Sequence, residues 1–241
     1  VSGLFNNANY NGCWLNIIWP FSMALLFEKT FNIFKRTIVL SIGLSISVAI
    51  FITASRSAWG GFLLSTYLLL GNEILLSLII GIIVLVFIPI IFQFIAPNGI
   101  FNFPTILPEQ YNILKQFDPS NYPEENQRFF IYKFALDMIK SRPFIGWGAA
   151  TFSLYYFSKT NAFIAHPHNL FLEIGFSYGS LASFAALINI VLLCIFSYRK
   201  IFLVKTKSPK IKNYFENAWW ISFFVLLCSQ MLDIQYFDGR I

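Results

Sequence analysis

Two long stretches of this sequence are almost free of charge, and no other feature constrains the fold as strongly. Residues 37–72 contain one charged side chain, Arg56, and residues 74–108 contain none. Because about 20 apolar residues in a helix cross the roughly 30 Å hydrocarbon core of a bilayer, both stretches are long enough to span it. Charged residues make up only 12% of the chain, against about 25% in soluble domains. We therefore predict an integral membrane protein.

Apolar segments recur along the whole chain, as in a polytopic helical bundle. We predict an all-α integral membrane protein with about six transmembrane helices and one long outer loop, residues 97–168. No repeat of fixed period and no low-complexity linker divides the sequence, so residues 1–241 are expected to form a single membrane domain. The spans are predicted near residues 11–27, 37–54, 57–71, 74–96, 169–198 and 216–234.

Basic residues set the expected orientation of these spans. Lys29, Lys35 and Arg36 lie between the first two spans, and six of the seventeen Lys and Arg residues lie within residues 199–212. Short basic loops face the cytoplasm, which places loop 97–168 on the outer side. The net charge of +6 then indicates contact with anionic lipid, not with nucleic acid.

The outer loop contains one segment with helical periodicity. Pro123 and two glutamates suit a first helical turn, and a proline at residue 143 ends the pattern. Between them, large apolar side chains recur every four residues, at Phe130, Phe134 and Met138. We expect an amphipathic helix that lies against the membrane surface or the bundle.

Arg56 is the first candidate for chemistry, because an arginine between two apolar spans is costly to insert in a membrane. Gly60 and Gly61 follow it and permit close helix packing, which favours a functional hairpin. The competing interpretation is a structural arginine at a span end whose charged group reaches into the aqueous interface.

The second candidate is His166-Pro167-His168-Asn169, which contains both histidines of the chain and lies where the outer loop re-enters the membrane. A histidine there can exchange protons near neutral pH. Alternatively, His168 and Asn169 only cap the fifth span. The pair could also chelate a metal ion, but ligands from elsewhere would be required, and we expect none.

Arg128 is the third candidate, with Arg142 at the other end of the amphipathic helix; a solvated helix face would contain the same residues. Taken together, basic groups and histidines gather on the outer face, which suits an anionic, lipid-linked substrate, since arginine binds phosphate oxygens two at a time. The sequence contains no Walker-type glycine-rich loop, so we expect no nucleotide hydrolysis.

Three segments, in this order, match a known pattern: Thr53-Ala54-Ser55-Arg56 with Ser57-Ala58-Trp59-Gly60, Arg128 through Pro143 to Gly148, and His168-Asn169 followed by Gly179 after nine residues. On them the sequence resembles the bacterial O-antigen ligase and O-antigen polymerase family of membrane glycosyltransferases. The ending, residues 233–238, resembles cyanobacterial members. Family proteins are longer at the N-terminus, so the chain is expected to be truncated there.

The resemblance implies transfer of a glycan from undecaprenyl pyrophosphate to an acceptor on the periplasmic side of the plasma membrane, without metal, nucleotide or other cofactor. It implies that Arg56 and Arg128 hold the pyrophosphate and that His168 deprotonates or orients the acceptor. His166 supplies a second imidazole that could be the base instead. Arg142, His166 and Asn169 complete the predicted substrate-binding set. One departure is Ala182, where a small or hydroxyl residue is usual.

Ligase, polymerase and protein-glycosylating transferase share these motifs, and the sequence does not decide among them. A multi-pass solute or anion transporter is the alternative from another class, because an outer arginine could attract anions. Transporters place ionisable groups near the bilayer midplane, whereas here they collect at the outer edge, which favours the transferase.

Overall fold

The structure is a computed structural model that describes residues 5, 7–71, 76, 128–203 and 214–234, and the regular elements of these residues are helices. The span predicted at residues 74–96, the outer loop up to residue 127 and the basic residues 204–213 lie outside the described residues.

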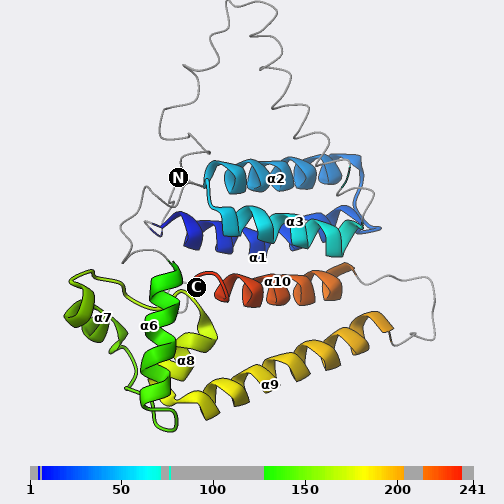
Figure 1. The fold of residues 1–241 in the computed structure, drawn as a ribbon. Coiled ribbons are helices and arrows are strands. Elements are labelled where there is room, and N and C mark those ends of the chain that lie inside the picture. The colour runs from blue at the N-terminus through cyan, green and yellow to red at the C-terminus, as the bar shows by residue number, and fades with distance from the viewer. Residues whose placement is uncertain (1–4, 6, 72–75, 77–127, 204–213, 235–241) are drawn as a thin grey trace, which may run out of the picture.

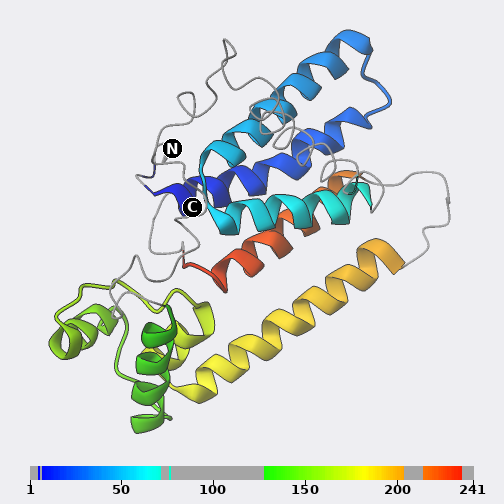
Figure 2. The ribbon, with the colours of Figure 1, turned by 45° about the horizontal axis from the view of Figure 1, so that its top comes forward.

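Four helices form a bundle: α1 (Ala8–Leu26), α2 (Ile33–Ile52), α3 (Arg56–Leu70) and α10 (Tyr214–Gln230). The helix α1 contacts the other three and is the centre of the bundle (Figures 1 and 2). The side chains of Asn7, Asn32 and Ser55 cap α1, α2 and α3. These caps accept hydrogen bonds from N–H groups that have no partner in the first turn, so each helix begins where such a residue precedes an apolar run.

The bundle core contains aromatic rings and points where helix backbones approach closely. Trp19, Ile50 and Trp220 belong to one buried cluster, and Nε1 of Trp19 donates a hydrogen bond of 2.9 Å to Ser47. A Cβ on Gly12 would overlap the side chain of Ala58, so α1 and α3 pack this closely only because Gly12 has no side chain. Small residues at such crossings are typical of membrane helix pairs.

The helix α9 (Ser180–Tyr198) continues into a π-helical turn, η6 (Arg199–Leu203), and none of its residues is buried. It lies apart from the bundle at its start and comes closer to α10 toward its C-terminal end (Figures 1 and 2), where Trp220 donates a hydrogen bond of 2.9 Å to Ser197. A helix that is apolar on all sides and not covered by protein suits a lipid environment.

Two helices among the described residues are long and apolar enough to cross a membrane, Ile33–Ile52 and Ser180–Leu203. The 15 residues of α3 extend about 22 Å and the 17 residues of α10 about 26 Å, both less than the roughly 30 Å of hydrocarbon. The structure therefore supports a membrane protein, and the number of six spans stays a prediction.

A second unit lies at one end of the bundle and contains α6 (Arg128–Ser141), α7 (Phe152–Thr160) and α8 (Leu170–Tyr178). Its core consists of Ile131, Ala135, Phe152, Tyr156 and Phe176. The predicted amphipathic helix is α6. Its most buried residues, Ile131 and Ala135, lie next to the predicted positions 130 and 134, and they belong to this core.

The range predicted as one span, residues 169–198, contains two helices, because the chain turns sharply at Gly179. This glycine has a φ of +93°, and a Cβ there would lie 2.5 Å from the carbonyl oxygen of Phe144. Only glycine permits both the left-handed backbone and this close approach. The break keeps α8 beside α6, so the residues just before α8 stay at the end of the bundle.

Candidate functional site

Segments that are far apart in the sequence meet at one end of the bundle (Figure 1). They are the start of α1, the turn between α2 and α3, the start of α6, the loop before α8 and the residues that follow α10. Hydrogen bonds between side chains join these segments. The candidate site is therefore a cluster assembled from the whole described chain, with His168 and Asp233 at its centre.

His168 and Asp233 form the shortest ionisable pair of the cluster, with Nδ1 of the histidine 2.8 Å from Oδ1 of the aspartate. An ionised Asp233 can only accept a hydrogen bond. In the neutral imidazole of His168, Nδ1 therefore carries the hydrogen and Nε2 keeps its lone pair. The His168 side chain is 29% exposed, whereas that of Asp233 is 4% exposed. An accessible imidazole oriented by a buried carboxylate is the arrangement of a general base.

Asp233 is held by further hydrogen bonds. Nδ2 of Asn9 donates to Oδ2 at 2.9 Å, and the backbone N–H of Ile234 donates to Oδ1 at 3.0 Å. Burial acts to raise the pKa of Asp233, but the hydrogen bonds and charges of its partners outweigh it, and the pKa is lowered. Asp233 is therefore a carboxylate at neutral pH.

His166 lies behind this pair and is buried, with a side-chain exposure of 7%. Its Nδ1 accepts the backbone N–H of His168 at 3.2 Å, which leaves the hydrogen of the neutral ring on Nε2, 3.9 Å from Asp233. Burial, together with the charge of His168, lowers the pKa of His166 to about 4. His166 is thus neutral at pH 7 and has no free lone pair for a substrate.

The backbone of His168 is in the left-handed region, with a φ of +53°. Non-glycine residues in this region are uncommon and concentrate at functional sites. The hydroxyl of Tyr132 donates to the carbonyl oxygen of His168 at 3.4 Å. Contacts from α6 therefore support the conformation that directs the His168 ring toward Asp233.

Arg56 is connected to the same cluster through its neighbour Ser55. The Ser55 hydroxyl donates to Oδ1 of Asn9 at 2.6 Å, and the amide of Asn9 in turn donates to Asp233. Ser55 also caps α3, so Arg56 is the first residue of that helix, and it is exposed. The motif around Arg56 and the His168 loop are thus parts of one hydrogen-bonded network.

Arg128 is exposed at the first turn of α6, one turn before Tyr132. Burial raises the pKa of Tyr132, and the charge of Arg128 and its hydrogen bond to the tyrosine oppose this shift. Through Tyr132, which contacts His168, Arg128 lies on the same side of the second unit as the cluster.

The structure gives different positions to the remaining predicted residues. Asn169 caps α8 through hydrogen bonds from the N–H groups of Phe171 and Leu172, and its amide donates to the carbonyl of Met231 at 3.1 Å. The oxygen and the nitrogen of this amide are therefore both engaged in hydrogen bonds within the protein. Arg142 lies about 21 Å along α6 from Arg128 and packs over Trp147 at 4.0 Å, so the structure does not bring it to the cluster.

His166, His168 and Asp233 also offer three possible metal ligands whose atoms lie within 4.8 Å of one another. The hydrogen bonds described above do not suit this role, because a ligating nitrogen needs a free lone pair. Nδ1 of His166 accepts an N–H, and Nδ1 of His168 faces the carboxylate. These two nitrogens are therefore used in hydrogen bonds in this arrangement.

Asp233, Asn9, Ser55 and Tyr132 were not singled out as functional from the sequence. One signal was present for Asp233, which is the only acidic residue between Glu216 and Asp238 and follows a long apolar run. No comparable signal marks Asn9, since its partner Asp233 is 224 positions away. Such contacts depend on how α1 and α10 pack.

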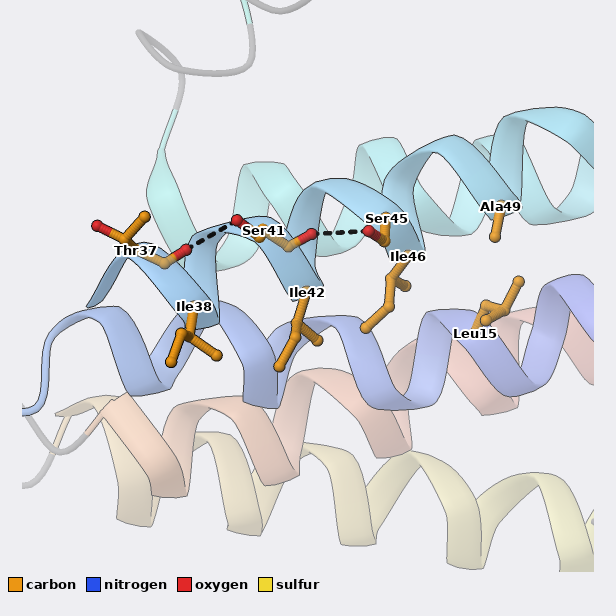
Figure 3. Close-up of a pocket in the computed structure, with 8 residues that line it drawn as sticks. All are labelled: Leu15, Thr37, Ile38, Ser41, Ile42, Ser45, Ile46 and Ala49. Carbon is orange, nitrogen blue, oxygen red and sulfur yellow. Dashed lines mark hydrogen bonds between the residues drawn. The ribbon is translucent and has the colours of Figure 1, made fainter. Parts of the chain in front are cut away.

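A separate open groove of about 500 Å³ runs between α2 and α1 and is lined by residues such as Ile38, Ile42 and Leu15 (Figure 3). The hydroxyls of Ser41 and Ser45 in this groove donate to carbonyls one turn earlier, at 3.0 and 2.8 Å. The groove therefore offers an apolar surface without free polar groups, and no residue that lines it belongs to the cluster.

The fold and the cluster define a helical, membrane-associated protein with a histidine–carboxylate pair at one end of its bundle. Residues 39–187, more than half of the chain, match the family model described as O-antigen ligase, and the chain belongs to this family. Its function is thus membrane glycan processing of the O-antigen ligase type, on a lipid-linked glycan. Neither a curated protein nor a solved structure matched the chain. The matched range includes Arg56, Arg128 and His168, and it ends before Asp233.

Proposed function

We propose that this protein transfers a glycan from a polyprenyl pyrophosphate, such as undecaprenyl pyrophosphate, to an acceptor at the periplasmic face of the plasma membrane. The observation that supports this most is the 2.8 Å contact of His168 with Asp233, which orients an accessible imidazole nitrogen at the end of the bundle. The same network holds the turn that carries Arg56.

In the proposed reaction, Nε2 of His168 takes the proton of an acceptor hydroxyl while the hydroxyl oxygen attacks the anomeric carbon of the donor. The bond from that carbon to the pyrophosphate breaks, and the pyrophosphate leaves with the electron pair. Arg56 and Arg128 stabilise the charge that develops on it, since guanidinium groups bind phosphate oxygens and stay charged. Asp233 stabilises the imidazolium that forms. No step requires a metal ion.

The basic residues support the proposed orientation. Lys29 lies between α1 and α2, Lys35 and Arg36 lie in the first turn of α2, and Arg199 and Lys200 begin η6 after α9. Both groups lie at the end of the bundle opposite the cluster (Figure 1). Because basic ends face the cytoplasm, this distribution supports an outer position for the cluster. We propose that the whole protein crosses the membrane several times, with about six spans in this chain.

Reconstitution tests this function against the transporter alternative. The full-length protein in vesicles receives an oligosaccharide linked to polyprenyl pyrophosphate, and glycan transfer and release of the pyrophosphate lipid are scored beside uptake of solutes. Transfer coupled to lipid release is the expected result. Solute uptake without transfer would exclude the enzyme. Acceptors that are glycan, lipid A core or protein, tested in turn, distinguish ligase, polymerase and protein glycosylation.

A further inference from the structure

A cavity of about 180 Å³ lies between α1, α3 and α10, next to the cluster but deeper in the bundle. Cys13 and Asn16 of α1 line it, one and two turns after the Asn9 that binds Asp233. Gly60 and Gly61 line it from α3, one turn after Arg56. The cavity has about the liquid volume of six water molecules, enough for a group the size of one isoprenoid unit or one sugar ring.

The cavity is accessible on the side of Gly60. This glycine is exposed, and a Cβ built on it would meet no atom within 4 Å. Gly61, by contrast, is in contact with the bundle, since a Cβ there would lie 2.6 Å from Asn16. Residues four apart on a helix lie on one face, so the opening is directly below Arg56, about one helical turn deeper.

The surface of the cavity is mainly apolar, although several of its residues have polar side chains. Ser57 is engaged with Ser55 at 2.9 Å, and the amide nitrogen of Asn16 donates to the carbonyl of Ala58 at 2.8 Å. The Asn16 oxygen has no partner, but it has less than 1 Å² of accessible surface. The two cysteines act as small apolar groups.

These observations decide between the two possible occupants. A sugar ring would bring several hydroxyls into a space where few polar atoms are accessible, and unpaired buried hydroxyls are unfavourable. A hydrocarbon chain has no such requirement. The depth of the cavity also favours a hydrocarbon chain. If Arg56 holds the phosphate, the chain attached to that phosphate would enter the hydrocarbon region about one helical turn below Arg56, where the cavity lies.

Resting on the proposed function, we propose that this cavity binds the first isoprenoid unit of the carrier lipid, with Gly60 as the opening through which the chain passes. Arg56 would bind the pyrophosphate and the cavity the chain attached to it. The missing side chain of Gly60 then determines which lipid chains the protein accepts.

The variant Gly60→Leu tests this proposal, because it adds an apolar side chain at the opening, where a Cβ meets no atom within 4 Å. It also replaces glycine by a better helix former, so the helix should remain intact. Binding of polyprenyl pyrophosphate without a sugar is measured on the full-length protein in detergent, beside the unlinked oligosaccharide. Gly60→Ala gives a graded change. The control is Tyr67→Leu, which alters an exposed aromatic residue of the same helix outside the cavity.

We expect Gly60→Leu to weaken binding of polyprenyl pyrophosphate at least tenfold, with a smaller effect from Gly60→Ala and none from Tyr67→Leu. Unchanged binding of the lipid in Gly60→Leu would refute the proposal, and so would a loss confined to the oligosaccharide, which would assign the cavity to a sugar. Because the measurement needs no transfer, it separates this proposal from the proposed function. If lipid binding depends on Gly60 but the protein transfers no glycan, only the proposed function is refuted.

Discussion

Replacing Asp233 with asparagine perturbs the centre of the cluster while keeping the size of the side chain. Oδ1 of Asp233 accepts hydrogen bonds from His168 and from the N–H of Ile234, and Oδ2 accepts one from Asn9. An amide has a single acceptor oxygen, so either orientation of the new side chain places a donor against a donor. The variant therefore loses the charge beside His168 and at least one hydrogen bond.

The expected size of the effect follows from these contacts. A hydrogen bond to a charged group contributes about 1.5–3 kcal/mol, so the free energy of unfolding should fall by about that amount. If the amide nitrogen faces His168, the imidazole proton moves to Nε2 and the base is lost. A positioned base contributes on the order of 10² to 10⁴ in rate, and we expect the rate of glycan transfer to fall within that range.

The assay is the transfer rate of the full-length protein in vesicles, with the thermal unfolding midpoint measured on the same preparation. Asp137→Asn is the matched control, since Asp137 is an exposed carboxylate on α6 whose nearby partner is Lys140 at 3.6 Å. This variant should transfer at the wild-type rate. Wild-type transfer by Asp233→Asn would refute the orienting role of the carboxylate.

Three further predictions concern pH, backbone geometry and metal ions. Burial lowers the pKa of His166 from 6.5 to about 4. The free energy of unfolding should therefore be highest above pH 6.5 and fall by about 3 kcal/mol as the pH drops toward 4. The unfolding midpoints of His166→Gln should not show this dependence on pH. Gly179→Ala should lower the free energy of unfolding by at least about 2 kcal/mol, since the new Cβ would meet the carbonyl of Phe144. The control Gly60→Ala should not lower it, because a Cβ there meets no atom. Equal unfolding midpoints for the two variants would contradict this prediction. Glycan transfer should be unchanged by EDTA, because Nδ1 of His166 and Nδ1 of His168 are both engaged in hydrogen bonds, and a loss that zinc restores would show a metal site.

The helices of the bundle could be predicted from the sequence because apolar runs and capping residues are local signals. Ser55 before Arg56 and Asn7 before Ala8 lie where helices begin, as the local rules require. The break at Gly179 was not predicted, since a glycine within an apolar run does not reveal that the backbone of Phe144 lies against it. That contact depends on the packing of the second unit.

The candidate site was predictable in part for a similar reason. Arg56, Arg128 and His168 are polar residues placed at the ends of apolar or amphipathic segments, which makes them visible in the sequence. The choice between His166 and His168 depends on burial and on which nitrogen accepts the N–H of His168, and these follow only from the folded loop. Arg142 had the same sequence signal as Arg128, and the length of α6 separates the two.

The most direct test of the account is the rate of glycan transfer from a polyprenyl pyrophosphate donor by His168→Ala, measured beside wild type in vesicles with membrane insertion checked for both. The account predicts a loss of about 10² to 10⁴ in rate with insertion unchanged, because the variant retains the fold but has no base at the outer end of the bundle. Transfer at the wild-type rate by His168→Ala would contradict it.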